Sequence, residues 1–219
     1  MSECSLYLIS PTQIELPKFI PVMEEAFAAG GVKSFQLRLK NASDAEILAA
    51  AEKIAPICHQ YEAAFIINDR ADLVVQCAAD GVHLGQEDMS VQDARKIIGG
   101  QRVVGVSCHA SRDMAIDAAE ASADYVAFGA FFPTKSKPQE KIDKWGVPTA
   151  EIVEIWSTYT TIPCVAIGGM TPQNCAPLVK AGADFIGVLS YVWEHPKGAG
   201  KAVEEFMEVI AANLPAAQA

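Results

Sequence analysis

The sequence predicts an α/β protein in which one domain, residues 1–219, folds as a (β/α)8 TIM barrel. Short apolar runs alternate with stretches of helical periodicity, and this pair repeats eight times along the chain. The apolar runs lack polar–apolar alternation, which is typical of parallel strands covered on both faces. A chain of 219 residues suits one such domain, because α/β barrels often reach this length undivided. Eight units, with no G-x-G-x-x-G motif, favour a closed barrel over an open doubly wound sheet.

Each expected strand is short and rich in Val, Ile, Phe or Ala. In chain order the strands are residues 6–9, 34–39, 64–67, 81–84, 103–107, 125–128, 164–167 and 185–189. The helical stretches that follow them are residues 18–29, 45–60, 71–78, 91–98, 112–122, 149–158, 172–181 and 201–213. Ser43 is the expected N-cap of the second helix, because Glu46 three positions later completes a capping box.

Three helix-to-strand turns repeat one pattern, in which a helix ends, an aspartate lies in the turn and an apolar strand begins. The aspartates are Asp80, Asp124 and Asp184. Because such turns lie at the amino ends of the strands, we expect these residues on the stabilising face of the barrel, away from the chemistry.

Residues 131–148, after the sixth strand, are the longest stretch without a predicted element. Long loops in compact domains are usually functional or disordered. One interpretation is a mobile active-site loop that acts as a lid, and the other is a charged excursion into solvent.

Composition and charge exclude several classes of partner. The net charge is −10, so no basic surface is expected to attract nucleic acid or an anionic membrane. The sequence has no membrane-length apolar run and no signal-peptide pattern at its start. The six cysteines show no C-x-x-C pair and no zinc spacing, which favours buried thiols in the reducing cytoplasm. Small-molecule substrates are the expected partners, and the sequence leaves a homo-oligomer open.

Polar clusters follow five of the predicted strands, at the end where TIM barrels carry their active sites. The clusters are residues 36–40, 68–70, 86–88, 107–109 and 133–137. Gly168, Gly169, Leu189 and Ser190 end the seventh and eighth strands, where such barrels often bind phosphate. Glycines allow backbone N–H groups to approach phosphate oxygens closely.

Gln36, Arg38 and Lys40 alternate along the predicted second strand, so their side chains share one face. Two cations facing the barrel interior would be costly without a partner, which indicates an anionic ligand such as diphosphate. An ion pair with Asp69 or Asp88 is the structural alternative, and it is compatible with ligand binding.

Asp69 and Asp88 follow the third and fourth strands, which are neighbours in a barrel. Two carboxylates beside an anionic substrate suit Mg2+, whose shell typically takes one or two carboxylates, phosphate oxygens and waters. Glu87 is the alternative to Asp88, and Asn68 is expected to orient a ligand. The competing interpretation is that both acids cap the helices that follow them.

Ser107 and His109 form a Ser-x-His pair, but nothing marks the orienting acid or the oxyanion hole that a nucleophilic serine needs. We expect Ser107 to donate a hydrogen bond to a phosphate and His109 to contact the substrate. His59, His83 and His195 lack partner spacing for a metal site and are interpreted as structural.

In order and spacing, these motifs resemble those of the thiamine-phosphate synthase family over nearly the whole chain. The matching segments are Gln36-x-Arg38-x-Lys40, Ile67-Asn68-Asp69-Arg70, Gly81-Val82-His83-Leu84-Gly85-Gln86-Glu87-Asp88, Gly105-x-Ser107-x-His109, Phe132-Pro133-Thr134-x-Ser136-Lys137, Ala166-Ile167-Gly168-Gly169 and Leu189-Ser190. The resemblance implies a (β/α)8 transferase that couples hydroxymethylpyrimidine diphosphate to thiazole phosphate. In the implied reaction, the methylene–diphosphate bond ionises with the help of Mg2+, and the thiazole nitrogen captures the carbocation.

The resemblance also implies roles for individual residues. Mg2+ would be held by Asp69 and Asp88, and the pyrimidine diphosphate by Gln36, Arg38, Lys40, Asn68, Ser107 and Lys137. Thr134, Ser136, Gly169, Leu189 and Ser190 would hold the thiazole phosphate, with Gly168 beside them. Arg38, Lys40 and Lys137 would be the catalytic cations, acting by electrostatic stabilisation of the leaving diphosphate.

The chain departs from the family pattern around the thiazole side, at Ala130, at Ser136 and at the bulky residues from Tyr191 to Trp193. Three alternatives stay open. A thiazole tautomerase is a similar barrel with a histidine at the Ser-x-His position, but it generally lacks the second metal aspartate and the Phe-Pro-Thr loop. The others are an aldolase with Lys40 as its Schiff-base amine and a degenerate barrel that acts as a ligand sensor.

Overall fold

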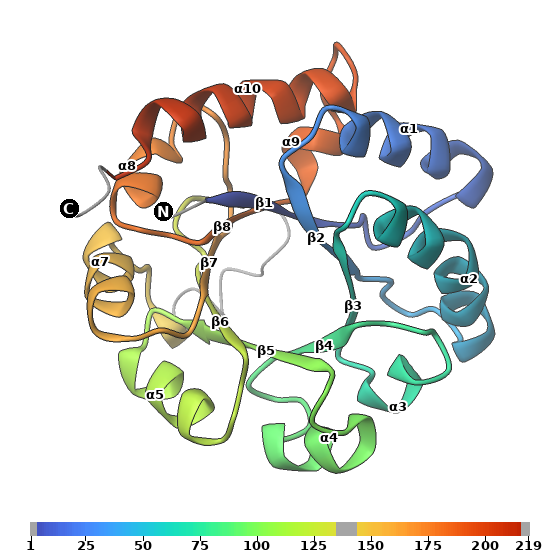
Figure 1. Cartoon of the computed structure of the whole chain (residues 1–219), viewed down its shortest axis with the longest axis horizontal. Coiled ribbons are helices and arrows are strands. Elements are labelled where there is room, and N and C mark those ends of the chain that lie inside the picture. The colour runs from blue at the N-terminus through green and yellow to red at the C-terminus, as the bar shows by residue number, and fades with distance from the viewer. Residues whose placement is uncertain (1–3, 135–143, 216–219) are drawn as a thin grey trace.

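The computed structural model describes residues 4–134 and 144–215. Eight parallel strands pair in sequence order, and the last pairs with the first, so the sheet closes into a barrel. The helices form a ring around the strands (Figure 1). The predicted (β/α)8 fold is confirmed. The expectation of a mobile loop over residues 131–148 falls mostly on residues 135–143, which lie outside the described residues.

The strands are short, as the sequence predicts. They are β1 (Ser5–Ile9), β2 (Val32–Leu37), β3 (Ala64–Asn68), β4 (Gly81–Leu84), β5 (Val103–His109), β6 (Tyr125–Phe128), β7 (Cys164–Ile167) and β8 (Phe185–Val188). The helices are α1 (Leu16–Ala28), α2 (Asp44–Gln60), α3 (Ala71–Val74), α4 (Val91–Ile98), α5 (Arg112–Glu120), α7 (Ala150–Tyr159), α8 (Ala176–Lys180), α9 (Ser190–Trp193) and α10 (Ala199–Asn213). The capping box of Ser43 and Glu46 at the start of α2 is confirmed.

The prediction that Arg38 and Lys40 lie on the second strand is wrong. β2 ends at Leu37, and the chain then follows the loop after β1 instead of a neighbouring strand. The Arg38 backbone N–H donates to Ser10 Oγ at 2.8 Å, and the Lys40 N–H donates to the Thr12 carbonyl at 3.0 Å. The two cations therefore have different surroundings.

Three predicted helices are shorter in the structure, α3 and α8 most of all, and the helix α9 was not predicted. The helix expected at residues 71–78 ends at Val74 in α3, and the one expected at residues 172–181 begins at Ala176 in α8. Before α8, the Thr171 N–H donates to the Asn174 side chain at 2.9 Å, so a local turn occupies residues that the periodicity assigns to the helix. The unpredicted helix is α9, a single turn directly after β8.

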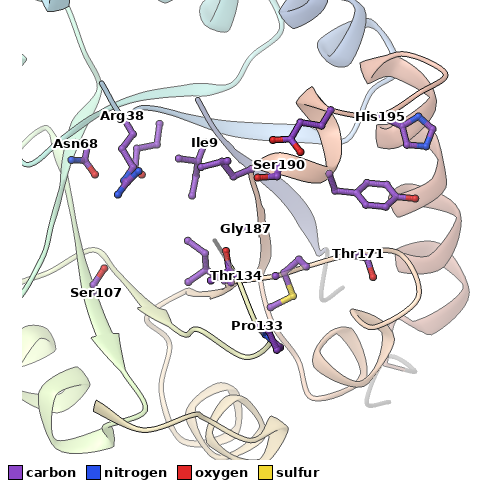
Figure 2. A pocket seen from close by; sticks show the side chains of 18 of the residues that line it. Ile9, Arg38, Asn68, Ser107, Pro133, Thr134, Thr171, Gly187, Ser190 and His195 are labelled. Atoms are coloured by element: carbon purple, nitrogen blue, oxygen red, sulfur yellow. The ribbon is translucent and has the colours of Figure 1, made fainter. Parts of the chain in front are cut away.

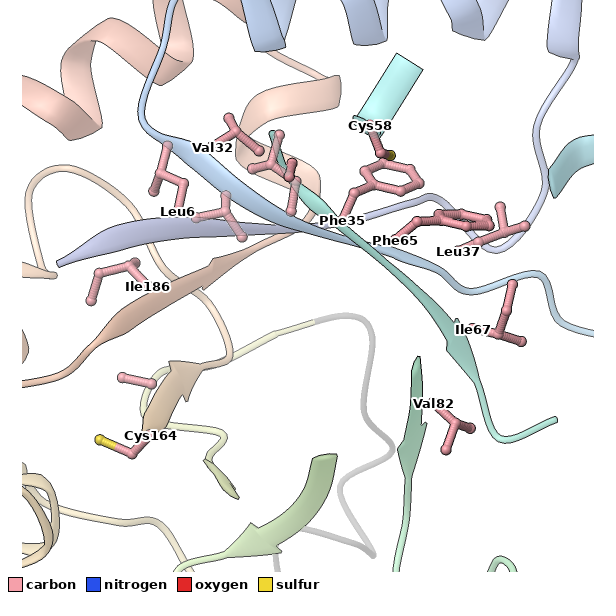
Figure 3. Packing of buried hydrophobic residues seen from close by; sticks show 14 of the residues in the cluster. Leu6, Val32, Phe35, Leu37, Cys58, Phe65, Ile67, Val82, Cys164 and Ile186 are labelled. Atoms are coloured by element: carbon pink, nitrogen blue, oxygen red, sulfur yellow. The ribbon is translucent and has the colours of Figure 1, made fainter. Parts of the chain in front are cut away.

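The main hydrophobic layer lies between the strands and the surrounding helices. Phe35 is fully buried on β2 and lies among the rings of Phe19, Phe27 and Trp193, with centroids 6.2–6.3 Å away. Figure 3 shows part of this layer, including Phe35 and Phe65. Fully burying one such side chain stabilises the fold by roughly 1.5–3 kcal/mol.

The three repeated aspartates each bind the start of the preceding strand. Asp80 accepts the Phe65 N–H at 2.7 Å, Asp124 accepts the Val104 N–H at 2.6 Å and Asp184 accepts the Cys164 N–H at 2.8 Å. Asp80 and Asp124 also donate their own backbone N–H to the carbonyl of the same residue. We call these three contacts the aspartate clamps. They join β3 to β4, β5 to β6 and β7 to β8 at the amino ends, so the expectation of a structural role is confirmed.

All six cysteines are buried and unpaired, as expected for small apolar side chains. Burial raises the pKa of the Cys175 thiol to about 11. Within residues 4–134 and 144–215, no helix has the length and apolar character needed to cross a membrane.

Candidate active site

A cavity of about 510 Å³ opens at the carboxyl ends of the strands. Figure 2 shows Arg38, Asn68 and Ser107 on one side of it and Thr171, Ser190 and His195 on the other. The predicted site residues that line the cavity are Gln36, Arg38, Asn68, Ser107, Thr134, Gly168, Gly169, Leu189 and Ser190. These residues come from six strands or the loops after them and meet in one place, as predicted for a barrel mouth.

Arg38 supplies positive charge to the cavity wall. Burial lowers the pKa of its guanidinium, and Asp69 is the one described charge that acts in the opposite direction. A partly buried guanidinium that faces a cavity favours an anionic ligand, with which it can form paired, charge-assisted hydrogen bonds.

Lys40, Asp69 and Asp88 form a charged cluster beside the cavity lining. The Lys40 ammonium donates to Asp69 Oδ2 at 2.7 Å, so the predicted ion pair is present. The Asp88 carboxylate accepts the Gly85 N–H at 2.7 Å. Desolvation raises the pKa of Asp88, and the nearby Asp69 carboxylate raises it further. The two acids therefore approach each other across the ends of β3 and β4.

The two carboxylates fit a magnesium ion. Neither caps a helix: Ser90 accepts the N–H of Asp93 at the start of α4, and the N-cap position of α3 is Arg70. Among the described residues, no three Cys, His, Asp or Glu side chains cluster as a metal site. Mg2+ commonly takes only one or two carboxylates and completes its shell with phosphate oxygens and water. A carboxylate pair beside a cavity lined by Arg38 is compatible with that requirement.

Glu87, the alternative to Asp88 as a metal ligand, has a different neighbour from the Asp69 and Asp88 pair. Its side chain lies 3.4 Å from the Lys144 ammonium, which also lies over the Trp145 ring.

His109 lies beside the cavity but does not line it. Its backbone has a positive φ of 53° at an irregularity of β5, and its ring stacks on Trp145 with centroids 4.9 Å apart. The structure thus places His109 in contact with the chain that follows residues 135–143. Ser136 and Lys137 lie outside the described residues.

The β7 and β8 side of the cavity is built from closely packed backbone. A Cβ atom on Gly168 would lie 2.4 Å from the Ala130 Cβ, and one on Gly169, whose φ is 64°, would lie 2.6 Å from the Pro133 carbonyl oxygen. Both positions therefore require glycine. Ser190 begins α9 directly after β8, and the Trp193 indole fastens that turn to the Ile9 carbonyl at 2.6 Å. TIM barrels commonly bind phosphate where these loops meet a short extra helix.

Several lining residues were not predicted. Tyr191 and His195 line the cavity and converge on Glu205 of α10, at 2.7 and 3.5 Å. His83 also lines the cavity, although the sequence analysis treats it as structural. Its partners come from other strands, so spacing along the chain could not identify them.

Comparison with known proteins gives consistent matches. Residues 6–192 match the family described as thiamine monophosphate synthase. A thiamine-phosphate synthase of Rhodospirillum centenum is 46% identical over 211 residues, which cover 96% of this chain and 99% of that protein. One from Erythrobacter litoralis is also 46% identical, covering 94% and 95%. The solved thiamine phosphate pyrophosphorylase of Pyrococcus furiosus superposes with a TM-score of 0.82 at 30% identity, covering 96% of each chain.

Proposed function

Because the chain belongs to the thiamine monophosphate synthase family, it is a transferase, and we propose that it couples hydroxymethylpyrimidine diphosphate with thiazole phosphate. The products are thiamine phosphate and diphosphate.

The observation that carries the proposal is a single cavity with two sides whose residues each suit an anion. Arg38, Asn68 and Ser107 line one side, beside the Asp69 and Asp88 pair. Gly168, Gly169 and Ser190 line the other. A diphosphate with its metal suits the first side, and a single phosphate suits the backbone of the second. The two reacting groups would then meet between them.

The proposed reaction needs electrostatic stabilisation and no proton transfer. The carbon–oxygen bond between the pyrimidine methylene and the diphosphate breaks, and its electron pair leaves with the diphosphate. The thiazole nitrogen then donates its lone pair to the methylene carbon. Arg38, Lys40 and Lys137 are assigned to the negative charge that develops on the leaving group. Mg2+ held by Asp69 and Asp88 would neutralise part of the same charge.

The test is thiamine phosphate formation from the two purified substrates, measured across a Mg2+ titration. We expect Asp69→Asn and Asp88→Asn to lower the rate and to shift the Mg2+ dependence to higher concentration, because each removes one anionic ligand. Glu87→Gln is the matched control, since Glu87 neighbours Asp88 but contacts Lys144. Wild-type rates and Mg2+ dependence in both aspartate variants would contradict the metal assignment.

The same assay separates the synthase from a tautomerase. The enzyme is given the thiazole phosphate alone and then together with the pyrimidine diphosphate. Coupling that survives His109→Ala is expected, because ionisation of the diphosphate requires no proton shuttle. Isomerisation without coupling, lost in His109→Ala and insensitive to a chelator, would identify a tautomerase instead.

A further inference from the structure

A chain of hydrogen bonds crosses the interior of the barrel beneath the cavity. The Gln36 amide nitrogen donates to the Tyr7 hydroxyl at 3.2 Å, and the Tyr7 and Tyr125 hydroxyls are 2.8 Å apart. The Tyr125 hydroxyl lies 2.9 Å from His83 Nδ1, and His83 Nε2 lies 2.9 Å from Ser107 Oγ. Both ends of this chain, Gln36 and Ser107, line the cavity. We call these five residues the interior relay.

The donor at the Gln36 end is fixed by its chemistry and is compatible with one direction along the interior relay. An amide nitrogen can only donate, so the Tyr7 oxygen accepts from Gln36 and its single hydrogen is available to Tyr125. In the direction we assign, Tyr125 accepts from Tyr7 and donates to His83 Nδ1, which the 2.8 and 2.9 Å distances allow. A neutral imidazole that accepts at Nδ1 carries its hydrogen on Nε2. That hydrogen points at Ser107.

We propose that His83 is a positioning residue which donates from Nε2 to Ser107 Oγ and thereby directs the serine's own hydrogen into the cavity. This inference rests on the proposed function, in which Ser107 binds the diphosphate. A hydroxyl that has accepted from His83 can give its hydrogen to an anionic oxygen. In the opposite direction, the Ser107 hydroxyl would donate its hydrogen to His83 Nε2. Only the lone pairs of the serine oxygen would then face the anion.

The burial of the two phenols keeps both hydroxyls protonated. Both tyrosines are buried within the barrel, and burial raises the pKa of each phenol well above its usual value of 10.0. Both hydroxyls therefore keep their hydrogens at neutral pH, and neither becomes an acceptor-only phenolate. A network of satisfied buried groups is also rigid, which suits a positioning role.

The first test measures the tautomer of His83 directly and needs no substrate. Nitrogen-15 NMR of histidine-labelled protein distinguishes the two neutral tautomers, and the His83→Gln variant identifies the His83 signals. We expect the Nε2–H tautomer in the wild type and a gain of the Nδ1–H form in Tyr125→Phe, which removes the donor to Nδ1 with little change of shape. An Nδ1–H tautomer in the wild type would overturn the proposal.

The second test asks whether the effect passes through Ser107. The affinity for inorganic diphosphate with Mg2+ is measured by calorimetry in Tyr125→Phe, Ser107→Ala and the double variant. We expect Tyr125→Phe to weaken binding about tenfold, the lower end for loss of a partner that orients a ligand group. In the double variant we expect no further loss beyond Ser107→Ala, because residues that act through one group are not additive.

Two comparisons complete the design. His83→Gln should bind diphosphate more tightly than His83→Ala, because its amide can still donate to Ser107. Tyr159→Phe is the control for loss of a tyrosine hydroxyl, since Tyr159 is 81% exposed. Equal losses from Tyr125→Phe with and without Ser107 would contradict the relay. If the wild type binds no diphosphate, the proposed function fails, and the tautomer measurement still decides the direction of the relay.

Discussion

Although Arg38 and Lys40 are only two residues apart, their side chains have different positions relative to the cavity. Lys40 is already paired with Asp69 and lies outside the cavity lining, whereas Arg38 lines the cavity. An incoming diphosphate would therefore contact Arg38 directly. Lys40 would instead act through its ion pair with Asp69, one of the proposed metal ligands. Substitution of Lys40 would therefore affect diphosphate binding and metal binding together.

Lys137 offers a direct test of electrostatic catalysis at a single residue. The proposed function assigns it to the leaving diphosphate, so we expect Lys137→Ala to lower kcat by about 10²- to 10³-fold, by analogy with a removed oxyanion donor. Lys33→Ala is the control, because it removes the same charge from a residue paired with Glu62. The kcat values and the urea unfolding midpoints of both variants are compared. A kcat near the wild-type value in Lys137→Ala would assign Lys137 to the solvated loop.

At the residue level, the position of a side chain at the cavity was predictable where one short motif carried the signal. Gln36, Arg38, Asn68 and Ser107 each follow or end an apolar run, and all four line the cavity. His83 was assigned a structural role because a lone histidine has no informative spacing. Its partners lie 24 and 42 positions away and become neighbours only when β4, β5 and β6 pair.

At the scale of elements, the aspartate clamps join a turn to the strand before it. Asp184 accepts the first N–H of β7, so Asp184→Ala leaves that group without its partner. We expect a loss of about 1–3 kcal/mol in the free energy of unfolding, the usual cost of an unsatisfied buried donor. Asp117→Ala, an exposed aspartate on α5, is the control and should change stability by no more than about 0.5 kcal/mol. Equal urea midpoints for the two variants would contradict the clamp.

Arg70 joins the starts of α2 and α3 in a pH-dependent way. It binds Asp44 and Asp72 at 2.6 Å, and these hydrogen bonds lower the pKa of both carboxyls below the ordinary 3.8. A lowered pKa stabilises the fold above the ordinary value, and the contribution disappears as the pH falls through the lowered value. The stability difference between wild type and Arg70→Ala should therefore be full at neutral pH and shrink below pH 3.8.

Urea unfolding at several pH values checks this expectation. Arg112→Ala, which removes an exposed arginine from the start of α5, is the control and should show no such pH dependence. A difference for Arg70→Ala that is constant from pH 7 to pH 3 would mean that the arginine acts by packing alone.

Element types were predictable and element ends were less so. Apolar runs predicted the strands, because each strand is covered by helices on its outer face and is largely buried. The end of β2 was missed because Ser10 Oγ and the Thr12 carbonyl bind the backbone of Arg38 and Lys40. Such partners come from another loop and leave no trace in the local pattern. The turn of α9 was missed for a similar reason, since a tertiary contact through Trp193 fastens it.

For the whole molecule, ligand binding should appear as thermal stability. A ligand that binds only the folded state adds about 2.7 kcal/mol at a hundred times its Kd. For a chain of this size, that gain raises Tm by about 5–10 °C. We expect inorganic diphosphate with Mg2+ to produce such a shift in the wild type and a smaller one in Asp88→Asn, measured by differential scanning calorimetry. Mg2+ without diphosphate is the control, and equal shifts in both proteins would separate diphosphate binding from the proposed metal.

The aspartate clamps and the cavity occupy opposite ends of the same strands. The clamps secure the amino ends in pairs, while the loops at the carboxyl ends carry Arg38, Asp69, Asp88 and the cavity lining. Changes to the loops at the carboxyl ends would therefore leave the aspartate clamps at the amino ends intact. During evolution, the residues that stabilise the barrel and the residues that determine ligand specificity can therefore change at different rates.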